Sequence, residues 1–283
     1  MADELPHSSN EDNSSDGDES SDEGNWPYSR DELVAAISDF YTFITRLHIP
    51  SSALKYPPEG GWPNITPENC SGFGKSDFVV DLIKHLPYID QGEKGADNYY
   101  SYNQAVDIHY KCNVIDYSHA TAEDFGGEYI KSGEIAAEGE GPVTADTVAL
   151  GNGHESGGRD ILLDTKRGEV IEEQIAYQRN CEADVREYFA DLKRQYEQLK
   201  LIPIPGYEIA ENIAEVEGVP DLRRQDDDNR FFPSDVEVQY IRHIYRSHGW
   251  PTPEFRKEEA LDAIRKFIRE RDPPSDDEED NDD

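Results

Sequence analysis

The sequence predicts an α+β fold, in which a small antiparallel meander is surrounded by helices and flanked by two disordered acidic tails. Short β-prone runs joined by glycine-containing turns follow one another between Thr147 and Glu173, which is typical of an antiparallel meander. Segments with apolar residues at helical spacing lie on both sides of this stretch. Helices, then strands, then helices favour one sheet packed against helices.

Charge divides the chain into a middle and two ends. The formal net charge of the 283 residues is −35. Residues 1–27 hold nine acids and residues 272–283 hold eight, and neither segment contains Lys or Arg. Such segments bury too little apolar surface to offset the entropy of ordering, so we expect disordered tails around a single domain at 28–271. An acidic surface argues against nucleic acid and favours a protein partner with a basic surface.

Membrane and targeting signals are missing from the sequence. It has no run of roughly 18 apolar residues, so we expect no membrane span. The acidic, serine-rich start is unlike a signal or transit peptide. The three cysteines, Cys70, Cys112 and Cys181, lie far apart. This sparse, odd count predicts reduced thiols and a cytoplasmic or nuclear location.

Local capping signals predict the first helices. Ser29 and Glu32 form a capping box, and the first helix should end near Leu47. Its apolar stripe consists of Leu33, Ile37, Phe40, Ile44 and Leu47. A proline-rich connector follows, after which Ser76 can cap a short helix closed by Pro87.

A strand is predicted from Val106 to Val114, because apolar and polar residues alternate there. Ile108 and Tyr110 should be buried. The expected polar face consists of Asp107, His109, Lys111 and Asn113. A long acidic loop should follow at about 120–141.

The meander itself should contain strands at 147–150, 160–164 and 169–172, with a glycine-rich loop from Gly151 to Gly158. Asn180 is the expected cap of the next helix. Its stripe consists of Val185, Phe189, Leu192, Tyr196 and Leu199.

The carboxyl-terminal part should add two helices. Ser234 and Glu237 form a second capping box, and Gly249 suits the end of that helix. Pro253 suits the first position of a last helix, and the two prolines at 273–274 should end the ordered chain.

The glycine-rich loop raises the question of phosphate binding through backbone amides. It lacks the lysine and hydroxyl residue that end a P-loop, and a strand follows it instead of a helix. A connecting loop is therefore the favoured interpretation. An enzyme or phosphate binder that uses Gly151–Gly158 remains an alternative.

The sequence predicts no catalytic residue, cofactor or metal. No Cys or His pairs have zinc-ligand spacing, and there is no Gly-x-Ser-x-Gly elbow. The candidate partner-binding residues are Trp62, His109, His154, Arg159 and Trp250. The two tryptophans lie in Gly-Trp-Pro turns, where a large aromatic side chain either pins the loop to the core or anchors a partner.

The stretch from Thr147 to about Leu199 resembles the SUKH superfamily of fungal cell-wall-assembly regulators and bacterial toxin-immunity proteins. The resembling residues are Gly158-Arg-Asp-Ile-Leu-Leu-Asp164, Gly168-Glu-Val170 and Tyr188-Phe189. This resemblance implies a SUKH-like centre at about 100–200, a fungal source, and an α+β domain that acts by protein–protein contact without a reaction.

The sequence therefore predicts a non-enzymatic, intracellular protein–protein interaction domain. The resemblance implies a regulatory or signalling role that is related to the cell wall or to stress. A second alternative is an acidic chaperone or decoy for basic proteins that acts through the tails. Ser15, Ser20 and Ser275 each have an acid three residues on. They are the candidate phosphorylation sites, since flexible acidic tails are accessible to acidophilic kinases.

Overall fold

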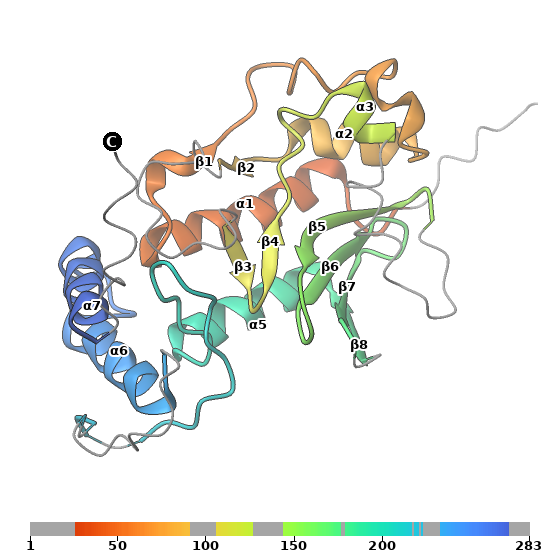
Figure 1. The fold of residues 1–283 in the computed structure, drawn as a ribbon. Helices are drawn as coiled ribbons and strands as arrows, with labels where there is room; N and C mark the ends of the chain where they lie inside the picture. Colours follow the sequence, from red (N-terminus) through yellow and green to blue (C-terminus); the bar gives the residue numbers. More distant parts are fainter. Residues whose placement is uncertain are drawn as a thin grey trace, which may run out of the picture.

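The computed structural model describes residues 26–90, 106–126, 144–176, 179–216, 218–220, 222 and 233–271. It confirms the α+β class (Figure 1). The helices are α1 (Arg30–Leu47), α2 (Asp77–His85), α3 (Ala122–Gly126), α5 (Val185–Glu197), α6 (Asp235–Ser247) and α7 (Lys257–Arg271), with 3-10 turns at Ser51–Ala53 and Asn69–Gly72. Apart from residues 26 and 27, the two predicted tails lie outside the described residues.

The main sheet is a six-stranded meander in which each strand pairs antiparallel with the next along the chain. Its strands are β3 (Asp107–His109), β4 (Cys112–Val114), β5 (Thr147–Gly153), β6 (Arg159–Asp164), β7 (Glu169–Gln174) and β8 (Arg179–Asp184). A separate pair joins β1 (Leu54–Lys55) to β2 (Tyr88–Ile89). The sequence correctly predicted an antiparallel meander, but it predicted three strands there, whereas the described sheet has six.

Strand β8 occupies the place where the sequence predicted the start of a helix. It pairs with β7 over its whole length, so Asn180 is not a cap. The side chain of Asp184 caps α5 instead, by accepting hydrogen bonds from the amides of Arg186 and Glu187. Both Asn and Asp are good caps. Pairing with β7 decides between them, because it keeps the chain extended up to Asp184.

The predicted single strand from Val106 to Val114 is a tight hairpin of β3 and β4. His109 pairs with Cys112, and Lys111 turns the chain with φ +48°. Lys111 is therefore in the left-handed region, where glycine or asparagine is usual. Because lysine is not a typical residue for this conformation, the sequence did not indicate a turn here. Ile108 is buried as predicted, but His109 is also buried, at 4% exposed, which contradicts its expected place on a polar face.

The three helix starts predicted from serine caps are confirmed. Both predicted capping boxes are present, at Ser29 and Ser234, and the Ser76 side chain accepts from the amide of Val79. The last helix begins at Lys257 and not at Pro253. Residues 252–255 form a turn first, in which the Phe255 amide donates to the Thr252 carbonyl.

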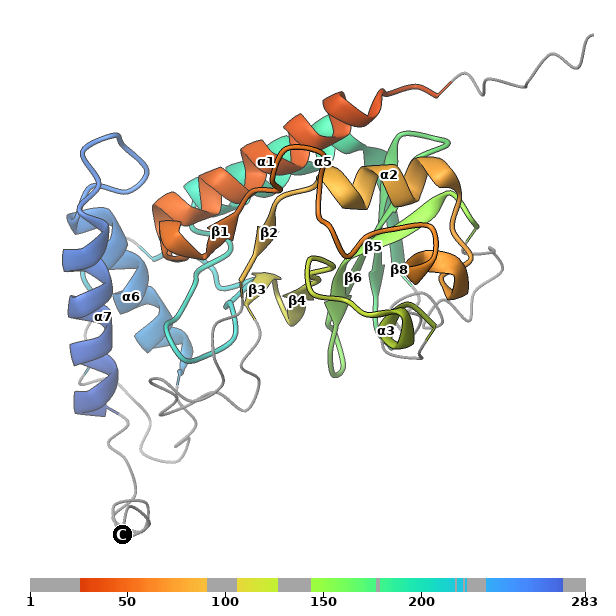
Figure 2. The ribbon, with the colours of Figure 1, turned by 90° about the horizontal axis from the view of Figure 1, so that it is seen from above.

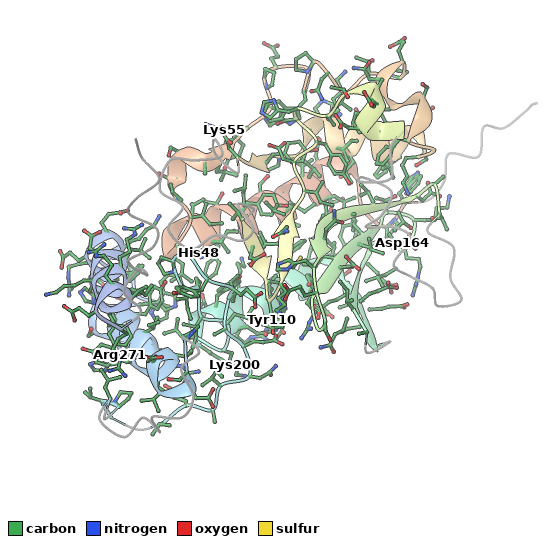
Figure 3. All side chains as sticks on the ribbon, in the orientation of Figure 1. His48, Lys55, Tyr110, Asp164, Lys200 and Arg271 are labelled. Atoms are coloured by element: carbon green, nitrogen blue, oxygen red, sulfur yellow. The ribbon has the colours of Figure 1, made fainter. Side chains whose placement is uncertain are left out.

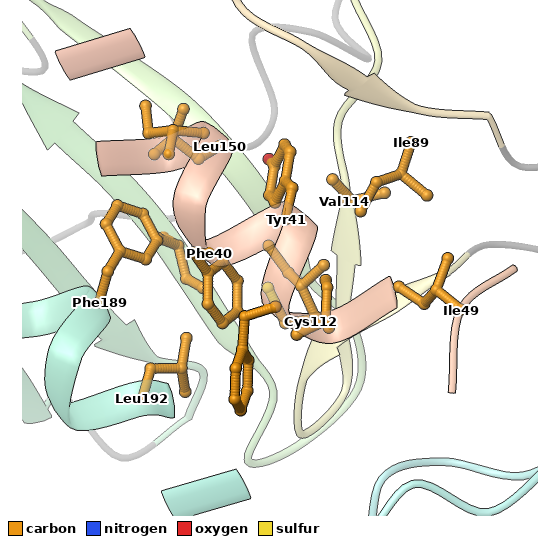
Figure 4. Packing of buried hydrophobic residues seen from close by; sticks show 14 of the residues in the cluster. Phe40, Tyr41, Ile49, Ile89, Cys112, Val114, Leu150, Phe189 and Leu192 are labelled. Atoms are coloured by element: carbon orange, nitrogen blue, oxygen red, sulfur yellow. The ribbon is translucent and has the colours of Figure 1, made fainter. Parts of the chain in front are cut away.

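Helices α1 and α5 lie side by side over one face of the sheet (Figure 2). Phe40 of α1 stacks on Phe189 of α5 with ring centroids 5.1 Å apart. Figure 4 shows Phe40 near Cys112 of β4 within this layer. The Tyr117 hydroxyl donates to the Ala149 carbonyl of β5, which ties the segment after β4 to the central strands.

Helices α6 and α7 form a pair beside the sheet (Figure 1). The Tyr245 hydroxyl donates to the Pro203 carbonyl. The ammonium of Lys257 donates to the carbonyls of Thr45 and Ile49 at 2.8 and 2.6 Å, so it satisfies carbonyl groups at the end of α1. None of the helices in the described ranges is both long and apolar enough to cross a membrane.

Candidate functional site at the hairpin tips and the outer strand

Three of the five candidate residues come together at one end of the sheet. His109 ends β3, His154 follows β5, and Arg159 begins β6. Tyr110, at the turn between β3 and β4, marks this end in Figure 3. The guanidinium of Arg159 lies 5.9 Å from the centre of the Tyr110 ring. Two hairpin turns therefore meet here.

The inner part of this end is a buried network centred on Arg159, which is 9% exposed. Its Nε lies 3.1 Å from Glu172 Oε1 and its Nη2 lies 2.9 Å from Glu211 Oε1. The Tyr188 hydroxyl donates to Glu172 Oε2 at 2.9 Å. Paired burial of these charges fixes the positions of β6, β7, α5 and the segment around Glu211 relative to one another.

His109 belongs to the same buried network. Its Nδ1 accepts from the Tyr110 amide at 2.7 Å, and its Nε2 lies 3.8 Å from Glu172 Oε2. Burial lowers the pKa of His109 to about 4, although Glu172 opposes this. The ring is therefore neutral near pH 7. His109 and Arg159 hold the sheet together from the inside, and neither lies open to a partner.

The outer part of this end is a half-exposed group of five charged or titratable residues, which we call the outer cluster: Asp107, Lys111, His154, Glu155 and Glu208. The Lys111 ammonium lies 2.7 Å from Glu155 Oε2 and 3.6 Å from Glu208 Oε1. His154 Nε2 lies 3.5 Å from Asp107 Oδ1. One ligand atom from each of His154, Glu155 and Glu208 lies within 4.8 Å of the others.

Asp107 is the most enclosed carboxylate of the outer cluster, with its side chain 15% exposed. Burial raises its pKa to about 6, and the charge of Glu208 adds to this, whereas His154 opposes it. Its Oδ1 is buried and lies 3.5 Å from His154 Nε2. The contacts of Asp107 with His154 and with the Cys112 backbone therefore oppose the effect of burial on its pKa.

The glycine-rich loop is a hairpin turn built on close packing. Gly151 and Gly153 belong to β5, and a Cβ at Gly151 would lie 2.5 Å from Cys112 Sγ. The amides of Gly153, His154, Gly157 and Gly158 donate to Asp160 Oδ1 and to the carbonyls of Lys111, Ile175 and Glu155. These four donors are engaged within the protein, which argues against a phosphate site.

Both tryptophans of the Gly-Trp-Pro turns pin their turns to the core. The Trp250 side chain is 3% exposed, and its Nε1 donates to the Tyr196 carbonyl at 2.9 Å. Trp62 Nε1 donates to the Leu86 carbonyl at 2.8 Å, and its ring packs against Tyr88. Neither tryptophan belongs to the segments that form the hairpin tips. Both indole N–H groups already donate hydrogen bonds within the protein.

Strand β8 forms one edge of the sheet and pairs only with β7 among the described strands. The Val185 amide donates to the Gly168 carbonyl, which makes Val170 and Ala183 a hydrogen-bonded pair. In an antiparallel ladder the residues between such pairs direct their N–H and C=O outward. The backbone groups of residues 180 and 182 therefore face away from β7.

The surface beside this edge carries more acid than base. Glu169 and Glu182 share Arg167, whose Nη2 lies 2.6 Å from each carboxylate. Glu173 is half-buried, and its burial raises its pKa. Ile171 lies on the same face between Glu169 and Glu173, in register with Glu182. We call this surface, with the outward backbone of residues 180 and 182, the β8 edge.

All three cysteines are free, which agrees with the predicted thiols. Cys70 and Cys112 are buried, and burial raises the pKa of each thiol. Cys181, on β8, is exposed. It is in register with Glu172 and therefore lies on the other face from Ile171 and Glu182, but it stands between residues 180 and 182 of the edge backbone and can report on that backbone by chemical labelling.

Comparison with known proteins gives no relative: no family model, curated protein or solved structure matches the chain.

Sequence reasoning missed Asp107, Glu155 and Glu208 as a group, and it missed the β8 edge. The adjacent His154 and Glu155 between two strands were a usable signal. Glu208 lies in a segment without a pattern, about fifty residues further on, so only the fold brings it near. Ser15, Ser20 and Ser275 lie outside the described residues.

Proposed function

We propose that this protein is a non-enzymatic interaction module that binds an extended, basic segment of a partner protein at the β8 edge. The observation that carries the proposal is an edge strand with outward backbone donors and acceptors next to Glu169, Glu173 and Glu182. Exposed edge strands are templates for pairing with another chain. Strand addition at a sheet edge is a recurring way to recognise extended peptides.

Charge supports a basic occupant. Three carboxylates flank Ile171 on this surface, and Arg167 is shared by two of them. The net charge of −35 attracts a cationic chain from a distance. Hydrogen bonds from the edge backbone would give affinity, and alternating Lys or Arg side chains would give selectivity.

The resemblance of Thr147–Leu199 to the SUKH superfamily implies the same class of function, because members of that superfamily act by protein–protein contact. A regulatory or signalling role follows from the same resemblance. Three free cysteines support a cytoplasmic or nuclear setting, where thiols stay reduced.

Alkylation of Cys181 in the full chain tests the site. The probe is a synthetic peptide that alternates lysine with threonine, and the control peptide replaces lysine with glutamate. We expect the lysine peptide to slow maleimide labelling of Cys181, and added salt to reverse this effect. The glutamate peptide should leave the labelling rate unchanged.

Matched charge reversals separate the β8 edge from the acidic tails. Glu169→Lys with Glu182→Lys should abolish protection of Cys181, whereas Asp276→Lys with Glu278→Lys in the tail should leave it intact. The opposite ranking would favour the acidic chaperone that acts through the tails. Unprotected Cys181 at saturating lysine peptide would refute strand addition.

A further inference from the structure

We propose that the outer cluster binds a divalent transition-metal ion through Asp107, His154, Glu155 and Glu208. This inference concerns the hairpin tips and is independent of the β8 edge. The ligand set comes from three separate parts of the chain: the start of β3, the turn after β5, and the segment that leads toward Ala210.

The geometry places one nitrogen and two carboxylate groups close together, with the carboxylate of Asp107 beside the nitrogen. Ligand atoms of His154, Glu155 and Glu208 lie within 4.8 Å of one another, and His154 Nε2 lies 3.5 Å from Asp107 Oδ1. Ligands about 2.0–2.2 Å from a zinc ion lie roughly 3.3–3.6 Å apart in a tetrahedron. The Asp107–His154 distance already fits this geometry.

The remaining ligands have freedom to move inward. The side chains of Glu155 and Glu208 are 63% and 42% exposed, so rotation of their χ angles can close the gap without moving the backbone. Asp107 and His154 are 15% and 17% exposed and form the fixed side of the site. Two fixed and two mobile ligands permit entry of an ion from solvent.

The chemistry of the donors selects the class of metal. Imidazole suits zinc and its neighbours, whereas carboxylates also suit manganese and calcium. One imidazole with three carboxylates therefore favours Zn²⁺ or Mn²⁺ over Mg²⁺, which requires near-ideal octahedral oxygen ligands. Asp107 Oδ1 is buried 3.5 Å from His154 Nε2, and a cation held by both groups would compensate the charge of this carboxylate.

Lys111 occupies the cation position between Glu155 and Glu208. Its ammonium lies 2.7 and 3.6 Å from their carboxylates, so an entering ion must displace it. Lysine is flexible and strongly hydrated, which makes this displacement feasible. Lys111 and the metal ion therefore compete for the same carboxylates, so removal of the ammonium should strengthen metal binding.

Zinc titration of the full chain, in excess Mg²⁺ and at physiological salt, tests the proposal. Calorimetry should show one saturable Zn²⁺ site, and thermal melting should show stabilisation by Zn²⁺. Loss of even an outer-shell partner typically costs about 10- to 100-fold in metal affinity. His154→Ala and Glu208→Gln should therefore each weaken Zn²⁺ binding at least about tenfold, and Lys111→Met should strengthen it several-fold.

His85→Ala is the matched control, because His85 Nδ1 also lies close to an aspartate, at 3.2 Å from Asp81 Oδ1. That pair belongs to no such group among the described residues, so its loss should leave Zn²⁺ affinity unchanged. Circular dichroism checks that each variant folds. If His154→Ala does not fold, Glu208→Gln still tests the site, because the Glu208 side chain is partly exposed. Equal Zn²⁺ affinity of the parent and Glu208→Gln, or no saturable site in the parent, would overturn the proposal.

Discussion

At the residue scale, His109 shows how burial turns a titratable side chain into a source of pH-dependent stability. Its folded-state pKa is about 4, below the usual value of about 6.5 in an unfolded chain. As the pH falls below the unfolded value, the unfolded state takes up the proton first, so stability decreases until the pH reaches the folded pKa.

We expect the titration of His109 to lower the free energy of unfolding by about 2 kcal/mol when the pH falls from 7 to 5. His109→Asn keeps an acceptor for the Tyr110 amide but does not titrate, so it should lack this component. Denaturant unfolding at both pH values measures it as the difference between parent and variant. Comparing the two proteins cancels the opposite contribution of Asp107, whose pKa is raised. An identical pH dependence in both would show that His109 titrates normally.

Gly151 is a second residue whose role follows from its surroundings, because there is no room for a side chain at this position. Because a Cβ there would lie 2.5 Å from Cys112 Sγ, Gly151→Ala should destabilise the protein by about 1–3 kcal/mol. Cys112→Ala removes the obstructing sulfur, so the double variant should recover part of this loss. A double-mutant cycle measures the coupling. Strictly additive effects would mean that the clash with Cys112 is not the cause.

At the scale of elements, sequence signals were sufficient where they are local. Ser29, Ser76 and Ser234 start helices, because capping depends on residues within one turn. Alternation could not distinguish one strand from the β3–β4 hairpin, because both have a period of two. The sheet also overrode the cap signal of Asn180. In both cases the outcome depends on strand pairing between residues that are distant in sequence.

The junction of α7 with α1 is also an interaction between distant elements. Lys257 donates to the Thr45 and Ile49 carbonyls, and hydrogen bonds to a charged group contribute about 1.5–3 kcal/mol. Lys257→Met, which keeps the apolar stem, should destabilise the protein by roughly this amount. Lys266→Met, on the same helix with its side chain 71% exposed, should change stability by less than about 0.5 kcal/mol. Chemical denaturation of both variants provides the comparison.

At the scale of the whole molecule, the fold assembles sites that no stretch of sequence contains. The ligand set of Asp107, His154, Glu155 and Glu208 spans about a hundred residues. Composition and periodicity predicted the fold class because they average over whole elements. They could not predict the outer cluster, because its members meet only when two hairpin tips and the segment containing Glu208 pack together.

The same long-range packing predicts that α6 and α7 unfold together with the sheet. Trp250 joins these parts: its ring lies 5.7 Å from the Phe43 ring of α1, and its Nε1 donates to the Tyr196 carbonyl of α5. Trp62 packs against Tyr88 on the other side of the domain. Helices gain most of their stability from tertiary packing, so a separate transition of α6 and α7 is not expected.

Two variants that each retain a single tryptophan, Trp62 or Trp250, with phenylalanine at the other two positions, test this cooperativity. Within each variant, the midpoint of denaturant unfolding from tryptophan fluorescence should coincide with the midpoint from circular dichroism, as two-state unfolding requires. Because the two probes are compared in the same variant, destabilisation by the substitutions does not matter. If Trp250 fluorescence changed at a lower denaturant concentration than circular dichroism, α6 and α7 would form a separate unit, and the single domain at 28–271 would be wrong.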